Sequence, residues 1–585
     1  MQGHHRARSH SWQRQINTPV LGWGAIAVGT IALALWLALD NQRAIVNLGG
    51  WPQLRRFWQA SLHPALQPDL LQIAAIATVQ TLAYAICGTA LSLVLGSVGG
   101  VLSAEVWWET VFGQRQGEHI PVWAVRRVAR HGVWLVRAGF AIPRAIHEMI
   151  WGLLFVNVWG TDPLTAVLAI AIPFGAITAK VFAEILDETP RAPLAALLNS
   201  GVPPGLAFAY GLLPQAMLNL LSYSFYRFEC SIRSATILGL IGAGGLGYQL
   251  LLSLQSLRYE EVWLFIDALV VLNGIVDVGS ARLRQWWRCP SRLDLNTHRR
   301  RDRLPAQLPL PPSPPRAPWQ TIGVCTAIAI GIIGAFQIVR PDLSKLTAPE
   351  TYQQWAILGR AAFPPDLTHL NELGPLSLQT AAMSVLAIAL AGCGGMVAAF
   401  FAARTVVLPG GWLHPGPLAY HQRLLGWGVF LSTRLGLLVC RAVPAPVWAL
   451  VGLYVLFPGI LPGAIALGIH NLGILGRLKT EVIENLDDRP LVALKAQGAP
   501  GSLVFLYGIL PLTLPRFVAY DLYRWEVCLR ETAIVGIVGA GGLGYQMNEQ
   551  LSSFDYAGLV TTLGCFLVLT VGIDWLSAQA RRSLR

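Results

Sequence analysis

Apolar segments long enough to cross a lipid bilayer recur along the whole chain. A membrane-spanning helix needs about 20 mostly apolar residues, and twelve such segments can be recognised, six in each half. They are residues 20–39, 71–102, 133–158, 164–182, 205–222 and 262–278, then 321–339, 376–401, 425–456, 460–475, 502–519 and 558–573. Only 13% of the residues are charged, against about 25% in soluble proteins. The sequence therefore predicts an all-α integral membrane protein and excludes a soluble enzyme.

Basic residues indicate how these segments are oriented. The formal net charge is +12, and positive charge in membrane proteins gathers in cytoplasmic loops. Arginines cluster before the first segment, between residues 115 and 130, between 282 and 318, and at 581–585. With twelve spans all four clusters fall on one side, so we expect both termini in the cytoplasm. These charges are too sparse for a nucleic-acid surface; the run in 282–318 could instead contact anionic lipid.

The two halves of the chain repeat each other. RFECSIRSATILGLIGAGGLGYQ, which begins at Arg227, matches RWEVCLRETAIVGIVGAGGLGYQ from Arg524 at 13 of 23 positions, with an offset of 297 residues. Six spans per copy is an even number, so the sequence predicts two parallel repeats that form a pseudo-dimer within one chain. We expect a tail, first helix and external loop (1–70), a first unit (71–281), an Arg/Pro-rich linker (282–318), a seventh helix and external loop (319–375) and a second unit (376–585).

Each copy carries a short polar stretch after its fourth predicted span. Acidic residues open it, a glycine closes it, and a proline stands thirteen residues after that glycine. Acidic residues favour a helix start, and glycine favours a helix end. We therefore expect a short amphipathic helix at the cytoplasmic face of each copy, although one such stretch alone could be an ordinary connection. The residues concerned are Glu184, Asp187, Glu188, Gly201 and Pro214, and Glu481, Asp487, Asp488, Gly498 and Pro511.

This doubled pattern resembles the coupling loop of ABC importer permeases, whose short helix docks into a partner ATPase. Where that family has a leading Glu, this chain has Ala195 and Val492. Docking would then use Asp187, Glu188, Asp487 and Asp488, or packing through Leu197 and Leu494. The resemblance implies two ATP-binding subunits, a periplasmic or lipid-anchored substrate-binding protein and a bacterial inner membrane. The sequence contains no phosphate-binding GxxxxGK[ST] motif, so we expect a transport subunit that is not an enzyme, with ATP and Mg on the partner and no cofactor or metal on this chain.

The glycine-rich segments and the charges before them resemble the phosphonate-type branch of these permeases. The residues are Arg227, Glu229, Arg233, Gly244, Gly245 and Gly247 in the first copy, and Arg524, Glu526, Arg530, Gly541, Gly542 and Gly544 in the second. Charges at membrane depth usually face a wet interior. Glu229 and Arg233 are four residues apart and could pair on a helix, which would leave Arg227 and Arg524 to face an oxyanion. Alternatively, all of these charges are structural pairs near the outer interface.

The predicted function is therefore an ATP-driven import permease for phosphonate-like oxyanions. Phosphite, hypophosphite and phosphate esters are alternatives within the same class. A secondary transporter driven by an ion gradient is the alternative from a different class.

Overall fold

The computed structural model describes residues 18–40, 45–113, 122–287, 318–412 and 419–583, and the predicted linker lies almost entirely outside these ranges. Within them the regular structure is helical, apart from one isolated β-bridge between Val46 and Leu456. The helices of the first half are α1 (Thr18–Asp40), α2 (Trp51–Ala60), α3 (Pro68–Ser103), α4 (Glu105–Gly113), α5 (Val122–Ala145), α6 (Glu148–Trp159), α7 (Pro163–Glu188), α8 (Ala192–Asn199), α9 (Pro204–Ala207), α10 (Leu213–Leu238), α11 (Gly245–Gln255) and α12 (Tyr259–Trp287).

The second half repeats this order. Its helices are α13 (Pro318–Val339), α14 (Pro349–Ala362), α15 (Leu370–Ala402), α16 (Arg404–Val407), α17 (Tyr420–Ala442), α18 (Ala445–Gly452), α19 (Ile460–Glu484), α20 (Arg489–Ala496), α21 (Gly501–Leu503), α22 (Leu510–Val535), α23 (Gly542–Ser552) and α24 (Tyr556–Ser583). Among the described residues, ten helices are long and apolar enough to cross a membrane, or up to twelve when each of two bent pairs counts as one span.

Two predicted spans are bent rather than straight. Residues 130–145 and 148–159 form helices that meet at 83°, because His147 ends one helix and caps the next by accepting a hydrogen bond from the Met149 N–H at 3.2 Å. In the second half α17 ends at Ala442 and α18 begins after Pro444. Proline lacks the N–H that would continue a helix, so the predicted span 425–456 is interrupted there.

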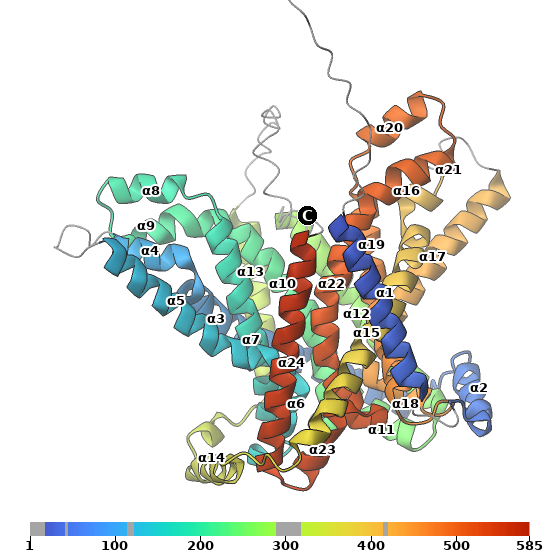
Figure 1. The fold of residues 1–585 in the computed structure, drawn as a ribbon, viewed down its shortest axis with the longest axis horizontal. Helices are drawn as coiled ribbons and strands as arrows, with labels where there is room; N and C mark the ends of the chain where they lie inside the picture. The colour runs from blue at the N-terminus through green and yellow to red at the C-terminus, as the bar shows by residue number, and fades with distance from the viewer. Residues whose placement is uncertain (1–17, 41–44, 114–121, 288–317, 413–418, 584–585) are drawn as a thin grey trace, which may run out of the picture.

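The first long helix of each half packs on the other half. Helix α1 contacts α15, and α13 contacts α3, as Figure 1 shows. The following loops cross in the same way: the Asn47 N–H donates to the Val455 carbonyl at 2.6 Å, and Lys345 pairs with Asp162 at 2.5 Å. The two halves are therefore tied together on both sides by exchanged segments.

The short helices α8 and α20 lie at one face of the molecule, on opposite sides of it (Figure 1). Helices α11, α14, α18 and α23 lie at the opposite end. We call these two ends the α8/α20 face and the α11/α23 face. The long helices α3, α7, α15, α19, α22 and α24 run between them.

Candidate functional site

The polar stretches form the predicted short helices, and the two copies end in the same way. Gly201 and Gly498 both have φ of +80°, a conformation that favours glycine. The N–H of the residue after each glycine donates back to Leu197 (3.1 Å) or Leu494 (3.2 Å), which is the hydrogen-bond pattern of a Schellman helix end. Each glycine thus turns the chain from the short helix toward the next span.

The prolines thirteen residues later stand directly after a widened helical turn. Residues 208–212 and 504–509 are π-helical, and Pro214 and Pro511 occupy the first turn of α10 and α22. A proline inside a regular helix would clash with the carbonyl four residues earlier, and the wider turn avoids that clash. Because no side chain stands at Gly211, Leu194 of α8 can pack directly against it.

Exposed residues on α8 and α20 differ in part from the predicted docking set. Ala195 is exposed and Val492 is 57% exposed, so small apolar side chains occupy the outer surface. Asp487 and Asp488 are exposed as well, and so is Glu188. Leu197 and Leu494 are half-buried. The outer face of each short helix is thus mainly apolar and is bordered by charged residues of both signs, including Arg191 and Arg489.

Asp187 has a structural role that the sequence did not reveal. Its carboxylate accepts a hydrogen bond from the Val106 N–H at 3.0 Å and pairs with Arg137 at 3.1 Å. In the second half the same contacts belong to Glu484, which accepts from the Arg404 N–H at 2.9 Å and pairs with Arg434 at 2.8 Å. These carboxylates join α7 to α4 and α5 in the first half, and α19 to α16 and α17 in the second. Glu184 and Glu481 pair within their own helices, with Lys180 (3.8 Å) and Arg477 (3.2 Å).

Both glycine-rich segments form a break at the α11/α23 face. Gly244 and Gly245 in the first copy, like Gly541 and Gly542 in the second, have φ between +72° and +87°. The axes before and after the first break differ by 56°. A Cβ at Gly247 would lie 1.9 Å from the Thr236 carbonyl oxygen, so glycine is needed for α11 to fold back against α10.

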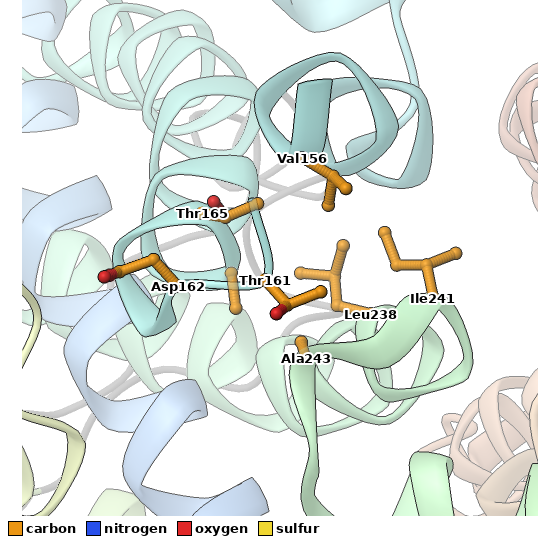
Figure 2. A pocket seen from close by; sticks show the side chains of 8 residues that line it. Val156, Thr161, Asp162, Thr165, Leu238, Ile241 and Ala243 are labelled. Carbon is orange, nitrogen blue, oxygen red and sulfur yellow. The ribbon is translucent and has the colours of Figure 1, made fainter. Parts of the chain in front are cut away.

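The helix after each break is capped by a residue from α3 or α15. The Thr81 hydroxyl accepts from the Leu246 N–H at 2.9 Å, and the Thr380 hydroxyl accepts from the Leu543 N–H at 2.9 Å. A cavity of about 10 Å³ lies beside the first break, and Figure 2 shows Ile241, Ala243 and Leu238 gathered around it. That volume holds about one water molecule.

The predicted pairing of Glu229 with Arg233 is wrong. Glu229 pairs with Arg284 of α12 at 3.1 Å and accepts from the Ser280 hydroxyl at 2.6 Å. Glu526 likewise pairs with Arg581 of α24 at 2.6 Å. The carboxylates turn outward to the last helix of their own half because that helix places an arginine beside them, which a pattern within one helix cannot indicate.

The same correction applies to the arginines predicted to remain free. Arg227 is buried, stacks over Phe174 with 4.5 Å to the ring centroid, and donates to the Tyr223 hydroxyl at 3.2 Å. Arg524 is buried and pairs with Glu531 at 2.5 Å and with Asn471. Both guanidinium groups are held inside their own half.

Within the described residues, Arg227, Arg233 and Arg530 have no carboxylate oxygen within 4.0 Å, and of these Arg233 and Arg530 stand at the same repeat position. Within the described part of the chain, the Arg233 side chain has one hydrogen bond, from Nη2 to Cys230 Sγ at 3.3 Å, and no acidic oxygen within 4.0 Å. Arg530 donates to the Arg144 carbonyl of the other half at 3.0 Å and to its own helix at the Glu526 carbonyl at 3.3 Å. An unneutralised arginine therefore stands at the same repeat position in each half, and that of the second half reaches across to the first.

Asp277 forms a cross-half ion pair that its repeat equivalent does not form among the described residues. Asp277 of α12 pairs with Arg441 of α17 and with Arg477 of α19 at 2.9 Å. The residues equivalent to Asp277 and Arg441 are Asp574 and Arg144. In the described residues, the Asp574 Oδ1 atom is buried without a hydrogen-bond partner. The two halves are therefore joined asymmetrically.

A buried carboxylate occurs at an equivalent place in both halves but on different helices. In the first half Glu148 of α6 accepts from the Ser234 hydroxyl of α10 at 2.6 Å. Glu531 of α22 stands at the repeat position of Ser234, and Ala445 stands at that of Glu148. The second half thus supplies from α22 the carboxylate that the first half supplies from α6.

Comparisons with known proteins agree with this architecture. The family model described as "Binding-protein-dependent transport system inner membrane component" matches residues 121–288 and 425–585, together more than half of the chain. The chain is 28% identical over 457 residues to a phosphate-import permease of Mycolicibacterium smegmatis, covering 77% of this chain and 78% of that protein. It is 32% identical over 268 residues to a phosphite transport system permease of Stutzerimonas stutzeri, covering 46% of this chain and 90% of that one. A putative cryptic phosphonate transport permease of Escherichia coli is 34% identical over 118 residues, covering 20% of this chain and 97% of that one. The chain belongs to the family of inner-membrane components of binding-protein-dependent transport systems, with the family's unit present twice.

Proposed function

We propose that this chain is the complete transmembrane pathway of an ATP-driven importer for a phosphonate-like oxyanion. Three relatives are named for phosphate, phosphite or phosphonate transport, and all three compounds are small oxyanions of phosphorus. The observation that carries the proposal is the repeated pair of arginines without carboxylate partners, Arg233 and Arg530. A cation at membrane depth is costly unless it serves a function, and guanidinium suits the oxygens of a phosphonate.

The α8/α20 face is the cytoplasmic side in this proposal. Each short helix would dock one ATP-binding subunit, mainly by packing against exposed apolar residues such as Ala195 and Val492. The exposed carboxylate of Asp488 would meet basic groups on the ATPase. Asp187 is not available for them, because its oxygens already hold Arg137 and the Val106 N–H. A substrate-binding protein would approach the α11/α23 face.

Growth on a single phosphorus source tests the class of substrate. The chain, its ATPase and its substrate-binding protein are expressed in a host that lacks phosphonate uptake but metabolises phosphonates. We expect growth on methylphosphonate, 2-aminoethylphosphonate or phosphite. Absence of growth on all of them, with the complex present in the membrane, would refute the oxyanion assignment. Uptake that persists without the ATPase would favour a secondary transporter.

The helix-ending glycines test the coupling. Gly201→Val and Gly498→Val force a β-branched residue into the left-handed region, which such residues rarely adopt. Neither glycine has atoms within 4 Å of an added Cβ, so strain in the turn, not crowding, causes the effect. We expect loss of uptake with protein still in the membrane. Gly205→Val is the matched control because Gly205 is helical and equally uncrowded.

The two unpaired arginines test the pathway. Arg233→Gln and Arg530→Gln should each lower the uptake rate at least tenfold while leaving ATPase binding intact. Arg360→Gln, an exposed position on α14, should leave uptake unchanged. If both arginine variants transport at the wild-type rate, these side chains do not line the route of the anion.

A further inference from the structure

An acidic pocket opens in the second half at the end of the molecule where α23 lies. Its volume is about 200 Å³, and its walls come from the α14–α15 connection, the first turn of α15, α23, the loop before α24 and α24 itself. Four carboxylates and one imidazole line it, together with amides and hydroxyls. The acidic residues are Asp366, Glu372, Glu549 and Asp555, and the imidazole is that of His369.

These carboxylates have few partners. Asp366 accepts hydrogen bonds from the Thr368 N–H (2.9 Å) and hydroxyl (2.7 Å), and these bonds hold its pKa below the ordinary value. Asp555 accepts from the Gly558 N–H at 2.9 Å, and Glu372 lies 3.4 Å from His369. In the part of the chain that the structure describes, no Lys or Arg pairs with any of the four. The pocket therefore carries a negative charge that the chain does not neutralise.

Two buried acceptors in the same wall are also unsatisfied. Gln550 is 7% exposed and Thr562 is fully buried. The Gln550 Oε1 and Thr562 Oγ1 atoms, both from residues that line the pocket, have no hydrogen-bond partner among the described residues. A buried polar atom without a partner costs about 1–3 kcal/mol. The described residues thus leave two polar atoms in the pocket wall without a partner.

The equivalent place in the first half already contains a basic group. Arg258 stands at the repeat position of Asp555 and donates to Glu261 at 3.2 Å. Ser253, at the position of Gln550, donates to the same carboxylate at 3.0 Å. Leu252 stands where the second half has Glu549. The first half thus closes this site with its own guanidinium, whereas the second half presents acceptors without one.

The chemistry of the lining selects the occupant. Phosphorus oxyanions are repelled by four carboxylates. Among the described residues, no three His, Cys, Asp or Glu side chains converge closely enough to share a metal ion. A long basic side chain fits, because lysine offers three N–H donors and arginine five, spread over several ångströms.

We propose that this pocket receives a lysine or arginine side chain of the substrate-binding protein, so that the partner docks in one orientation on the second half. This inference rests on the proposed function, which places that protein at the α11/α23 face. Because Arg258 stands at the equivalent place in the first half and pairs with Glu261, the basic side chain of the partner would enter the second half, which fixes the orientation of the docked protein. Charge complementarity of this kind mainly supplies specificity and speeds association.

Binding of the substrate-binding protein to the complete transporter in lipid nanodiscs tests the proposal. The protein used is the one that supports uptake with this chain. The double variant Glu372→Gln/Glu549→Gln removes two exposed charges and keeps the shape of both side chains. We expect Kd to rise at least fivefold and the salt dependence of association to weaken. Glu260→Gln, an exposed carboxylate in the first half before α12's apolar stretch, is the matched control and should leave Kd unchanged.

Zero-length carbodiimide coupling identifies the occupant. A crosslink between a lysine of the substrate-binding protein and Glu372 or Glu549 that is lost in the double variant supports the proposal. Equal Kd for the double variant and the wild type overturns it. The proposal is also overturned if Kd is unchanged and the double variant loses uptake of 2-aminoethylphosphonate but keeps uptake of methylphosphonate. The pocket would then hold the ammonium group of a free ligand. If the wild-type transporter binds no substrate-binding protein at all, the proposed function itself fails.

Discussion

Removal of the Asp277 carboxylate should weaken one of the contacts that join the two halves. Asp277→Asn leaves Arg441 and Arg477 without their shared anion, and Asp277 is only 13% exposed. Breaking a buried ion pair costs about 3–5 kcal/mol; partial hydration of these side chains reduces this to about 2 kcal/mol by the same reasoning. Because the pair joins the two halves, its removal destabilises the observed arrangement of the halves and leaves unchanged any conformation in which they have moved apart. A change of about 2 kcal/mol shifts a two-state equilibrium about 30-fold.

Basal ATP hydrolysis by the reconstituted complex, without substrate-binding protein, reports this shift. We expect Asp277→Asn to raise the basal rate by up to about 30-fold and to lower the thermal unfolding midpoint. Asp574→Asn is the matched control: it changes the equivalent residue, whose Oδ1 atom has no hydrogen-bond partner among the described residues. The asymmetry argument would be refuted if both substitutions changed the basal rate by the same factor.

Three further substitutions test individual contacts, each by thermal unfolding in nanodiscs. Glu531→Ser should destabilise the chain by about 3–5 kcal/mol because it leaves the buried guanidinium of Arg524 without its carboxylate. Adding Ala445→Glu should restore part of that stability. If the two substitutions destabilise additively, α6 and α22 do not exchange this carboxylate between the halves. Gly247→Ala should cost about 1–3 kcal/mol by overpacking, while Gly205→Ala should be neutral; equal effects would exclude the close helix approach. Lys479→Met should destabilise by about 1–3 kcal/mol because it strands the carboxylate that now lies 2.8 Å from the Lys479 Nζ atom; an unchanged midpoint would show that this pair is dispensable.

Much of the fold could be predicted because the lipid bilayer imposes a length and a composition on each span. The order of helices, the two short helices and their terminal glycines all follow from local patterns. The bends at His147 and Pro444 were missed because apolar composition continues across them. The exchange of α1 and α13 between the halves was also missed, since a pattern within one segment does not say which unit that segment packs on.

The sequence did not predict how the charges before the glycine-rich segments pair. Spacing along one helix favoured Glu229 with Arg233, whereas the structure pairs Glu229 with Arg284, 55 residues further along the chain. Arg284 pairs with Glu229 because α12 packs against α10 and brings the Arg284 guanidinium to the Glu229 carboxylate. The signal that could have found it is the repeat itself, since α24 presents Arg581 to Glu526 in a similar way.

The duplication does not make the halves equivalent, and the differences have a common physical form. At these places one half pairs a charged group with a group of opposite charge, and the other half has a charge or a hydrogen-bond acceptor without such a partner among the described residues. Arg258 closes the first half's version of the acidic pocket, and Asp555 leaves the second half's version open. Asp277 pairs with Arg441 across the interface, whereas the Oδ1 atom of Asp574 has no hydrogen-bond partner among the described residues. A symmetric pore needs none of these differences. In the proposed docking of one partner in one orientation, the acidic pocket of the second half would supply the asymmetry at the surface, whereas Asp277 makes the contact between the halves asymmetric.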